Sequence, residues 1–430
     1  MGVGLVGLGV VGTGLAKVFA EHGADIDARL GFPVRLVHVA DIDLARDRGV
    51  DLSRVARSTD WKEVVANPAV DIVVELIGGT GVARDVVLGA LAAGKSVVTA
   101  NKALLAQRGA ELDEAAERAG RDILFEASVA GTIPVLRALR EGLSADRIKT
   151  LHGIVNGTCN YILTQMEEHG ESYAGCLKRA QDLGYAEADP TADVEGHDSA
   201  NKLAILLGLA LGVRASVKDI PTRGISSIEA IDLEYAQRFG LRIKLLAVAK
   251  RAQGGIEARV EPTMIAESSV LARVSGSMNA IEVVGELSGP TLYCGAGAGA
   301  LPTASAVMGD VMELARSLRV GAARRVPSLG TVALREQPLL RSQDVEGEYY
   351  LRLWVLDEPG ALHAITGVLG RFGISIASML QPEHHHERSV PVVFLTHMTK
   401  ESELRSAVAE IERLASVRGA AQVIRVEREL

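Results

Sequence analysis

The chain has 430 residues, enough for two to four domains at about 150 residues each. Apolar residues make up 48% of the chain and charged residues 23%, which is typical of a soluble globular protein and excludes a mainly disordered one. A formal net charge of −8 and an aromatic content of 3% offer neither the basic face nor the stacking platforms of a nucleic-acid-binding protein.

The mean hydropathy of +0.19 makes a membrane span the next possibility to weigh. The longest internal apolar run, Leu203–Val213, is too short to cross about 30 Å of hydrocarbon and is typical of a buried helix. The apolar N-terminus lacks the basic start of a signal peptide, and the three cysteines form neither a CxxC pair nor a disulfide framework. The sequence therefore predicts a cytoplasmic protein with no membrane partner.

The first third of the chain alternates short apolar runs with helical patterns. The runs are Val3–Val6, Val34–Val39, Asp71–Leu76, Ser96–Thr99 and Asp122–Phe125, and the helical patterns include residues 83–93 and 107–119. Continuous apolar strands between helices are typical of a parallel sheet covered on both faces. The sequence predicts an α/β domain of the doubly wound Rossmann type over residues 1–130.

A glycine-rich loop, Gly7-Leu8-Gly9-Val10-Val11-Gly12, directly follows the first predicted strand and opens a helix. The first glycine permits a tight turn, the second lets the backbone approach a pyrophosphate, and the third lets helix and strand pack closely. The amides at the start of the helix, those of Val10 and Val11 included, offer N–H groups and positive potential to phosphate. In this context the pattern predicts dinucleotide binding.

Two further features bear on the cofactor. Asp41, at the end of the second strand, is the candidate partner of the ribose hydroxyls and favours NAD, but it comes later than the roughly 20 residues usual. We therefore expect an additional loop around residues 23–33. Arg46 and Arg48 are close enough in sequence to bind the 2′-phosphate of NADP instead, so the choice of cofactor stays open. Lys102 follows the fourth strand, either as a ligand-binding lysine at the carboxyl end of the sheet or as a surface lysine in a loop.

The middle third reads as an α+β domain over residues 131–320, and the helical pattern at 302–320 is expected to return to the first domain. Strands are predicted at 147–155, 242–251, 256–265 and 280–287, and helices at 160–168, 173–183 and 198–211. Strands of this domain could be shared across a two-fold axis, so we expect a homo-oligomer, either a dimer or a tetramer.

Asp198 and Lys202 are four residues apart at the start of an apolar helix and so share one helix face, behind a further carboxylate, Asp193. The alternative is an acidic turn that caps this helix. Another candidate is the stretch from Glu126 to Ile133, which is either a loop whose carboxylate and turned carbonyls hold a hard cation or a plain loop.

The last part begins with a polar, interrupted stretch at 321–346, which we interpret as a linker. Residues 347–430 follow the order βαββαβ, with strands at 349–355, 374–378, 390–396 and 423–426 and helices at 360–372 and 401–414. This is the ferredoxin-like pattern. The run His384-His385-His386 is expected at a solvated hairpin tip.

The stretch from Ala180 to Lys202 resembles the signature of homoserine dehydrogenases throughout, with Gly184-Tyr185-Ala186-Glu187, Asp189-Pro190, Asp193, Gly196, Asp198 and Lys202 at the expected spacing. The resemblance extends to the glycine-rich loop, Thr99–Lys102, Asn156-Gly157-Thr158 and Gly295–Ser305, and so spans roughly residues 1–320. The turn Asp357–Leu362 resembles that of an ACT domain. Because the glycine-rich loop follows Met1 so closely, we expect a monofunctional form without a preceding kinase module.

This resemblance implies NAD(P)-dependent interconversion of L-homoserine and L-aspartate 4-semialdehyde, a step in threonine, methionine and isoleucine biosynthesis. It implies Lys202 as the acid/base residue and Lys102 as a second lysine near the hydroxyl and the nicotinamide. The carboxylates implied to bind homoserine are Glu187, Asp193 and Asp198, and the backbone contacts near the cofactor are Gly184 and Gly299. A site for sodium or another monovalent cation, built from backbone oxygens, is implied at Glu126, Val129, Gly131 and Ile133.

The ACT resemblance implies regulation by an amino acid, for which L-threonine is the expected effector. Two alternatives are a non-catalytic sensor of NAD(P) and amino acids, and a related dehydrogenase of another amino or hydroxy acid. The signature lysine argues against the sensor, since a sensor needs no residue for proton transfer.

Overall fold

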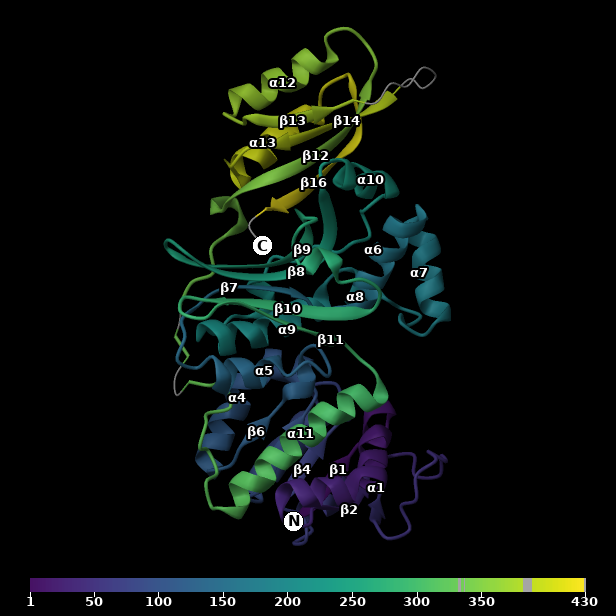
Figure 1. The fold of residues 1–430 in the computed structure, drawn as a ribbon, viewed down its shortest axis with the longest axis vertical. Helices are drawn as coiled ribbons and strands as arrows, with labels where there is room; N and C mark the ends of the chain where they lie inside the picture. The colour runs from purple at the N-terminus through teal and green to yellow at the C-terminus, as the bar shows by residue number, and fades with distance from the viewer. Residues whose placement is uncertain (332–333, 336, 382–388, 429–430) are drawn as a thin grey trace. The chain divides into compact units, whose positions relative to one another are not determined.

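The structure, a computed structural model, describes residues 1–331, 334–335, 337–381 and 389–428 (Figure 1). They form two compact units, between which the chain passes several times. The first unit holds residues 1–157, 199–220 and 278–337, and the second holds residues 158–198, 221–277 and 338–430. The histidine run at 384–386 lies outside the described residues.

The first unit contains a parallel sheet in the spatial order β3-β2-β1-β4-β5-β6. The order reverses between β1 and β4, and folds of this kind bind ligands at that point, beyond the carboxyl ends of the strands. The predicted Rossmann-type sheet is confirmed. Its elements are β1 (Gly2–Val6), α1 (Val10–Leu30), β2 (Arg35–Ala40), β3 (Ala56–Ser58), α2 (Trp61–Ala66), β4 (Ile72–Glu75), α3 (Val82–Ala92), β5 (Ser96–Thr99), α4 (Lys102–Ala119) and β6 (Ile123–Leu124).

The loop expected around residues 23–33 is wrong, because α1 continues through Gly23 to Leu30. Gly31 ends the helix in the left-handed conformation, with φ of 75°, and its N–H bonds the carbonyl of Asp27. A longer helix, not a longer loop, therefore accounts for the late position of Asp41. Lys102 is also not in a loop, since it is the first residue of α4.

Helix α11 (Ala300–Arg319) packs along α1 in the first unit (Figure 1). Its buried face, which includes Val307, Val311 and Leu314, belongs to the same apolar core as Leu5 and Leu15. The approach of the two helices is close at Gly14, where a β-carbon would lie 2.7 Å from the carbonyl oxygen of Ala300. The start of α11 is thereby fixed beside the glycine-rich helix.

The first unit also contains an antiparallel sheet in the order β11-β10-β7. The unit also contains an apolar helix, α9 continued by η3, whose residues 203–211 are mostly buried. These and the remaining elements of the unit are η1 (Glu126–Ser128), α5 (Val135–Arg137), η2 (Ala138–Gly142), β7 (Ile148–Ile154), α9 (His197–Leu206, whose first two residues belong to the second unit), η3 (Leu207–Leu211), η4 (Val217–Asp219), β10 (Met278–Gly285) and β11 (Gly289–Ala296).

The second unit is built on strands in the order β8-β9-β16-β12-β14-β13, with β15 paired to β12. Neighbours are antiparallel except β9 and β16, which are parallel. The elements are α6 (Gly157–His169), α7 (Tyr173–Asp182), α8 (Thr191–Val194), α10 (Ala230–Arg238), β8 (Leu241–Ala252), β9 (Gly255–Ala266), η5 (Leu271–Arg273), η6 (Ser342–Asp344), β12 (Glu346–Leu356), α12 (Ala361–Arg371), β13 (Ile376–Leu380), β14 (Ser389–Thr396), β15 (Thr399–Lys400), α13 (Glu401–Ile411) and β16 (Val417–Glu427).

The C-terminal part of the second unit has the predicted βαββαβ order, from β12 to β16, and its own apolar core. Side chains such as Leu351, Phe394 and Ile365 pack between the strands and the helices α12 and α13. This part is not tethered only through its N-terminal end, because β16 also pairs with β9.

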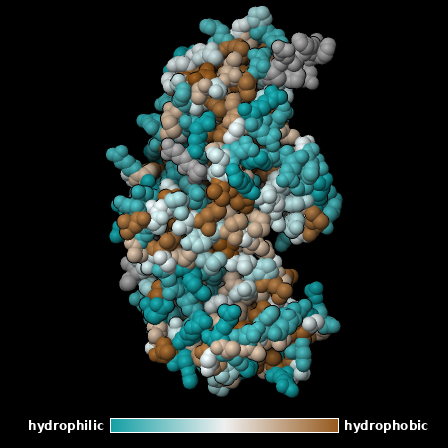
Figure 2. Space-filling model, in the orientation of Figure 1, coloured by the Kyte–Doolittle hydropathy of each residue, from teal (hydrophilic) through white to brown (hydrophobic). Residues whose placement is uncertain are grey.

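No helix in the described part of the chain is long and apolar enough to cross a membrane. Figure 2 shows hydrophilic residues spread over the visible face, with hydrophobic residues gathered in smaller areas between them.

Candidate active site

The glycine-rich loop has the geometry of a phosphate-binding turn. Gly7 has φ of 102°, which L side chains rarely adopt, and its N–H bonds the carbonyl of Ala40 at 2.8 Å. A β-carbon at Gly12 would lie 2.0 Å from the carbonyl oxygen of Gly7, so only glycine allows this helix start to pack on the turn. Gly9 faces open space, because a β-carbon there would have no atom within 4 Å, so its backbone is accessible to a ligand. The first amides of α1, at Val10 and Val11, have no partners within the helix by position and can bind it.

Asp41 ties the end of β2 to this loop. One carboxylate oxygen accepts the N–H of Leu8 at 2.5 Å, and the other accepts the N–H of Asp43 at 2.9 Å. Arg48 forms an ion pair with Asp41 at 3.1 Å and donates to the carbonyl of Leu8 at 2.6 Å. Asp41 and Arg48 therefore lie together at the loop, where the carboxylate can accept from ribose hydroxyls and the guanidinium can face a 2′-phosphate.

Buried polar residues support the carboxyl ends of β4 and β5, and one of them, Glu75, was not singled out in the sequence. Glu75 is fully buried, accepts the N–H groups of Ile77 and Gly78, and accepts the hydroxyl of Thr99 at 2.6 Å. Asn101 caps α4 by accepting the N–H of Leu104, and its side-chain amide donates to the carbonyl of Gly79 at 2.6 Å. A glutamate inside an apolar strand pattern was the available signal for Glu75.

These contacts fix the first turn of α4 and so place Lys102. Its backbone N–H bonds the carbonyl of Ala100 at 3.1 Å, and its side chain is half-buried. The position is the carboxyl edge of a parallel sheet, as expected for a residue that faces cofactor or substrate.

Lys202 lies on α9 and is buried, with 8% of its surface exposed. Its ammonium donates to the carbonyl oxygen of Val155 at 2.6 Å, just beyond the end of β7. Asp198, one helical turn earlier, is also buried. The two residues therefore lie on the same face of α9, as predicted. A buried lysine held by a carbonyl is aimed and partly stripped of water, which suits a group that transfers a proton.

In the second unit, the loop after α7 carries Gly184 and Glu187. Gly184 has φ of 76°, and the side-chain amide of Gln181 donates to the carbonyl of Glu187 at 3.1 Å. The hydroxyl of Thr158, at the start of α6, donates to the carbonyl of Tyr185 at 2.6 Å. The backbone of this loop is therefore fixed, while the carboxylate of Glu187 is exposed.

Asp193 lies in the short helix α8 and is half-buried. The carbonyl of Asp193 accepts from the thiol of Cys159 at 3.2 Å and from the N–H of Gly196 at 3.0 Å. Asp189 precedes the helix and accepts both the N–H and the hydroxyl of Thr191, and the hydroxyl lowers the pKa of Asp189. Asp189 therefore holds the first residue of α8, whereas the apolar helix α9 begins later, at His197.

The stretch from Glu126 to Ile133 is a tightly held turn in the first unit. The carboxylate of Glu126 accepts the N–H groups of Leu136 and Arg137 at 2.9 and 2.8 Å, so it caps α5. Ala130 and Gly131 have φ of 55° and 58°, which rotates the adjoining carbonyl groups. Burial raises the pKa of Glu126.

Asp310 on α11 lies against this turn and accepts the N–H of Glu126 at 2.8 Å. Burial, together with the charge of Glu126, raises the pKa of Asp310 to about 7. Among the described residues, no cluster of three or more histidine, cysteine or acidic side chains is placed to hold a metal. Any cation at this turn would depend mainly on backbone carbonyls.

The structure brings some of the predicted residues together within each unit. The glycine-rich loop and Asp41 are in contact, and Gly299 immediately precedes α11 where that helix meets α1. Lys102 and Lys202 lie on two helices of the first unit, α4 and α9.

Comparisons with known proteins agree with this arrangement. Residues 7–126 match the family model "Homoserine dehydrogenase, NAD binding domain", residues 134–312 match "Homoserine dehydrogenase", and residues 349–416 match "ACT domain". A homoserine dehydrogenase of Neisseria gonorrhoeae is 45% identical over 99% of this chain and 98% of its own.

Solved structures give the same result. The crystal structure of a homoserine dehydrogenase from Thiobacillus denitrificans is 45% identical, with a TM-score of 0.94 over 100% of this chain and 98% of its own. A hyperthermophilic archaeal homoserine dehydrogenase, solved in complex with NADPH, is 26% identical, with a TM-score of 0.61 over 78% of this chain and 99% of its own. The chain belongs to the homoserine dehydrogenase family, whose members are NAD(P)-dependent oxidoreductases acting on a CH–OH group, and it carries a C-terminal ACT domain.

Proposed function

We propose that Lys202 is the acid/base residue in the interconversion of L-homoserine and L-aspartate 4-semialdehyde. The observation that carries this proposal is the burial of Lys202 and its 2.6 Å hydrogen bond to the carbonyl of Val155, which aims the ammonium group. In the oxidation, the lysine in its neutral form accepts the hydroxyl proton as the C4–H bond breaks. In the reduction, its ammonium form returns that proton to the alkoxide oxygen.

The bound nicotinamide cofactor supplies the hydride acceptor or donor. Lys102, at the carboxyl edge of the parallel sheet, is the second lysine near the hydroxyl and the nicotinamide ribose. Gly184 and Gly299 would contact the cofactor through their backbones, and the loop Gly7–Gly12 would hold its pyrophosphate.

The substrate carries an ammonium group, for which carboxylates are suitable partners. We assign that binding to Glu187, Asp193 and Asp198. Neighbouring side chains fix the backbone around Glu187 and around Asp193. This supports a role in which each carboxylate must point at the ammonium group of the substrate.

We propose that the protein uses NADH at least comparably to NADPH. Asp41 contacts the glycine-rich loop, where its charge would repel a 2′-phosphate on the bound ribose, whereas the adjacent Arg48 would limit that repulsion. The archaeal neighbour was solved with NADPH, which is consistent with some use of NADP by this chain.

The turn from Glu126 to Ile133 fits a monovalent cation such as sodium. The buried hydroxyl of Thr132 has no hydrogen-bond partner within the described part of the chain, and carbonyls of Val129, Gly131 and Ile133 are hard oxygen donors of the kind such ions prefer. A cation here would brace the turn beside Asp310 and takes no part in the proton transfer.

The ACT domain is proposed to bind L-threonine. The turn 357–362 leads into α12 through Gly360, which has φ of 92°, and Ile374 is buried nearby in the same core. The amides at the start of α12 can meet the carboxylate of an amino acid. A homo-oligomer, dimer or tetramer, and a cytoplasmic location complete the proposal.

The effector proposal has a direct optical test. The chain has two tryptophans, Trp61 and Trp354, and Trp354 lies on β12 of the ACT domain. In a Trp61→Phe variant, L-threonine in the millimolar range should change the remaining fluorescence and inhibit the full-length enzyme, whereas D-threonine should do neither. Inhibition that disappears at saturating homoserine, without a fluorescence change, would place threonine at the substrate site instead.

The catalytic proposal is tested by oxidation of NADH and NADPH with L-aspartate 4-semialdehyde, with enzyme alone as the control. Turnover that depends on the semialdehyde is the expected result. A protein that binds both ligands without turnover would be a sensor, and turnover only with another aldehyde would indicate a related dehydrogenase.

A further inference from the structure

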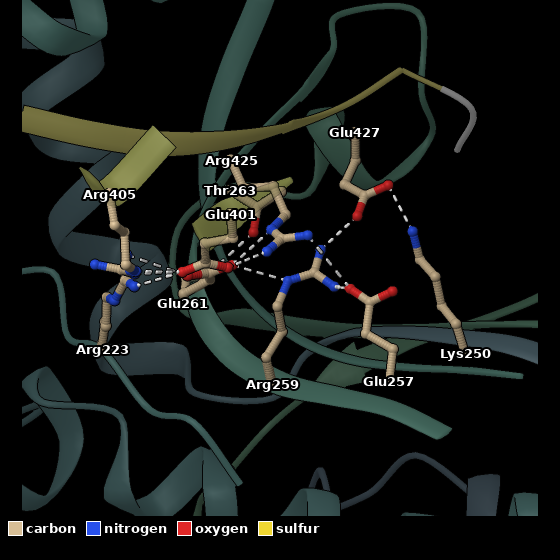
Figure 3. Close-up of polar contacts among 10 residues, drawn as sticks. All are labelled: Arg223, Lys250, Glu257, Arg259, Glu261, Thr263, Glu401, Arg405, Arg425 and Glu427. Carbon is tan, nitrogen blue, oxygen red and sulfur yellow. Dashed lines mark hydrogen bonds and ion pairs between the residues drawn. The ribbon is translucent and has the colours of Figure 1, made fainter. Parts of the chain in front are cut away.

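A buried network of ion pairs joins β9 to the C-terminal strand and helix of the second unit (Figure 3). At its centre are Arg259 and Arg425, which are 5% and 3% exposed, each between several carboxylates. Arg259 pairs with Glu257, Glu261 and Glu427, and Arg425 pairs with Glu257, Glu261 and Glu401. Removal of one partner from such a buried set leaves another charge uncompensated, so the members hold each other in place.

The parallel pairing of β9 with β16 explains why these charges meet. Residues 257, 259 and 261 alternate along β9 and therefore lie on one face of the strand. Arg425 is opposite Thr263 in the register, and Glu427 is opposite Ile265. Glu401, the first residue of α13, completes the set from the ACT domain.

Arg223 extends the network beyond these strands. Its guanidinium pairs with Glu401 at 3.1 Å and with Glu261 at 3.6 Å, and Figure 3 shows it and Arg405 directed at the same carboxylates. Its backbone N–H bonds the carbonyl of Val260 at 2.8 Å. Arg223 is thus attached to β9 by its backbone and to the ACT domain by its side chain.

The residues next to Arg223 pack directly on the turn that follows Asp193. The N–H of Ile225 bonds the carbonyl of Val194 at 2.8 Å. A β-carbon at Gly224 would lie 2.1 Å from that same carbonyl oxygen, and one at Gly196 would lie 3.0 Å from Thr222. Because the two segments are in such close contact and share a backbone hydrogen bond, a shift of the segment 222–225 would move the turn 194–196.

We propose that Arg223 is a positioning residue for the substrate-binding carboxylate of Asp193. The ion pair with Glu401 holds the segment 222–225, and this segment holds the turn that begins at Asp193. Because Glu401 is the first residue of α13, the affinity for homoserine then depends on the position of an ACT-domain helix. The proposal rests on the assignment of Asp193 to substrate binding.

The test compares Arg223→Met with Arg405→Met in the full-length enzyme. Arg405 pairs with the same Glu401 and has similar exposure, 50% against 43% for Arg223, but it lies on α13 and not on the segment 222–225. We expect Arg223→Met to raise KM for homoserine about tenfold, with kcat and KM for the cofactor changed less than twofold. Arg223→Lys should recover part of the loss, and Arg405→Met should change each constant less than twofold.

Other outcomes overturn the proposal. An unchanged homoserine KM in Arg223→Met does so, as does an equal rise in Arg405→Met or a parallel loss in kcat and both KM values. An Asp193→Asn variant separates the two assignments. If Asp193→Asn leaves KM for homoserine unchanged, the assignment of Asp193 fails and the proposal fails with it; if only Arg223→Met leaves it unchanged, the substrate assignment stands without the positioning role.

Discussion

Replacement of Asp310 by asparagine should remove a pH dependence of stability that the fold itself creates. Asp310 is 1% exposed, and burial is the main cause that raises its pKa from 3.8 to about 7. Between these values the unfolded chain carries an ionised Asp310 and the folded chain a protonated one. The resulting stabilisation is complete below pH 3.8 and is lost as the pH rises through about 7.

The size of the effect follows from the shift in pKa. Each pH unit well inside this window costs about 1.4 kcal/mol of unfolding free energy. Because Asp310 in the folded chain is half ionised at about pH 7, the slope falls there, and the loss between pH 5 and pH 7 is about 2 kcal/mol. Asparagine keeps an acceptor for the N–H of Glu126 but does not ionise. Urea unfolding of wild type and Asp310→Asn at pH 5, 6, 7 and 8, at one protein concentration, should give a flatter pH dependence for the variant.

Asp146→Asn is the matched control. The hydroxyl of Ser288 and amides of the same turn lower the pKa of Asp146 to about 2, so this group is ionised in folded and unfolded chains across the whole range. Its replacement should shift stability by the same amount at each pH. Equal slopes for wild type and Asp310→Asn between pH 5 and pH 7 would refute the reasoning.

Two other predictions concern the cofactor. Gly12→Ala would place a methyl group 2.0 Å from the carbonyl oxygen of Gly7, so we expect NADH binding, measured by fluorescence titration, to weaken at least tenfold. Gly23→Ala, in open space on the same helix, should leave NADH binding unchanged. Equal binding by both variants would contradict the packing argument. Asp41→Asn keeps the acceptor for the N–H of Leu8 but removes the charge that repels a 2′-phosphate. The ratio of kcat/KM for NADPH to kcat/KM for NADH should therefore rise severalfold. An unchanged ratio would place cofactor selection elsewhere.

The parallel sheet could be predicted closely because its strands are buried on both faces. The run Ser96–Thr99 is β5 itself, and the predicted ends of the strands near residues 3, 35 and 72 differ from the observed ones by at most one residue. The elements that were missed include β3, α2, α10 and β11, which are short, exposed or flanked by polar residues. Their ends depend on partners outside the local pattern, such as β2 for β3, about 18 residues earlier in the chain.

The candidate site was predictable as a set of residues and much less as a set of contacts. The spacing of Asp198 and Lys202 places both on one helix face, which α9 confirms in its geometry. The contact of Asp41 with the amide of Leu8, and the pairing of Glu401 with Arg223, join residues far apart in the chain, and no local pattern encodes them. Gly23 was misread because a single glycine in a helix costs only about 1 kcal/mol, which the rest of α1 outweighs.

Lys202 is the residue on which the proposed chemistry depends most directly. The decisive measurement is the single-turnover rate of Lys202→Met with homoserine and saturating cofactor, together with the dissociation constant for NADH. Loss of the group that transfers the proton should lower the rate by about 10²- to 10⁴-fold while the dissociation constant stays within twofold. A rate reduced less than about tenfold would contradict the assignment of Lys202 as the acid/base residue.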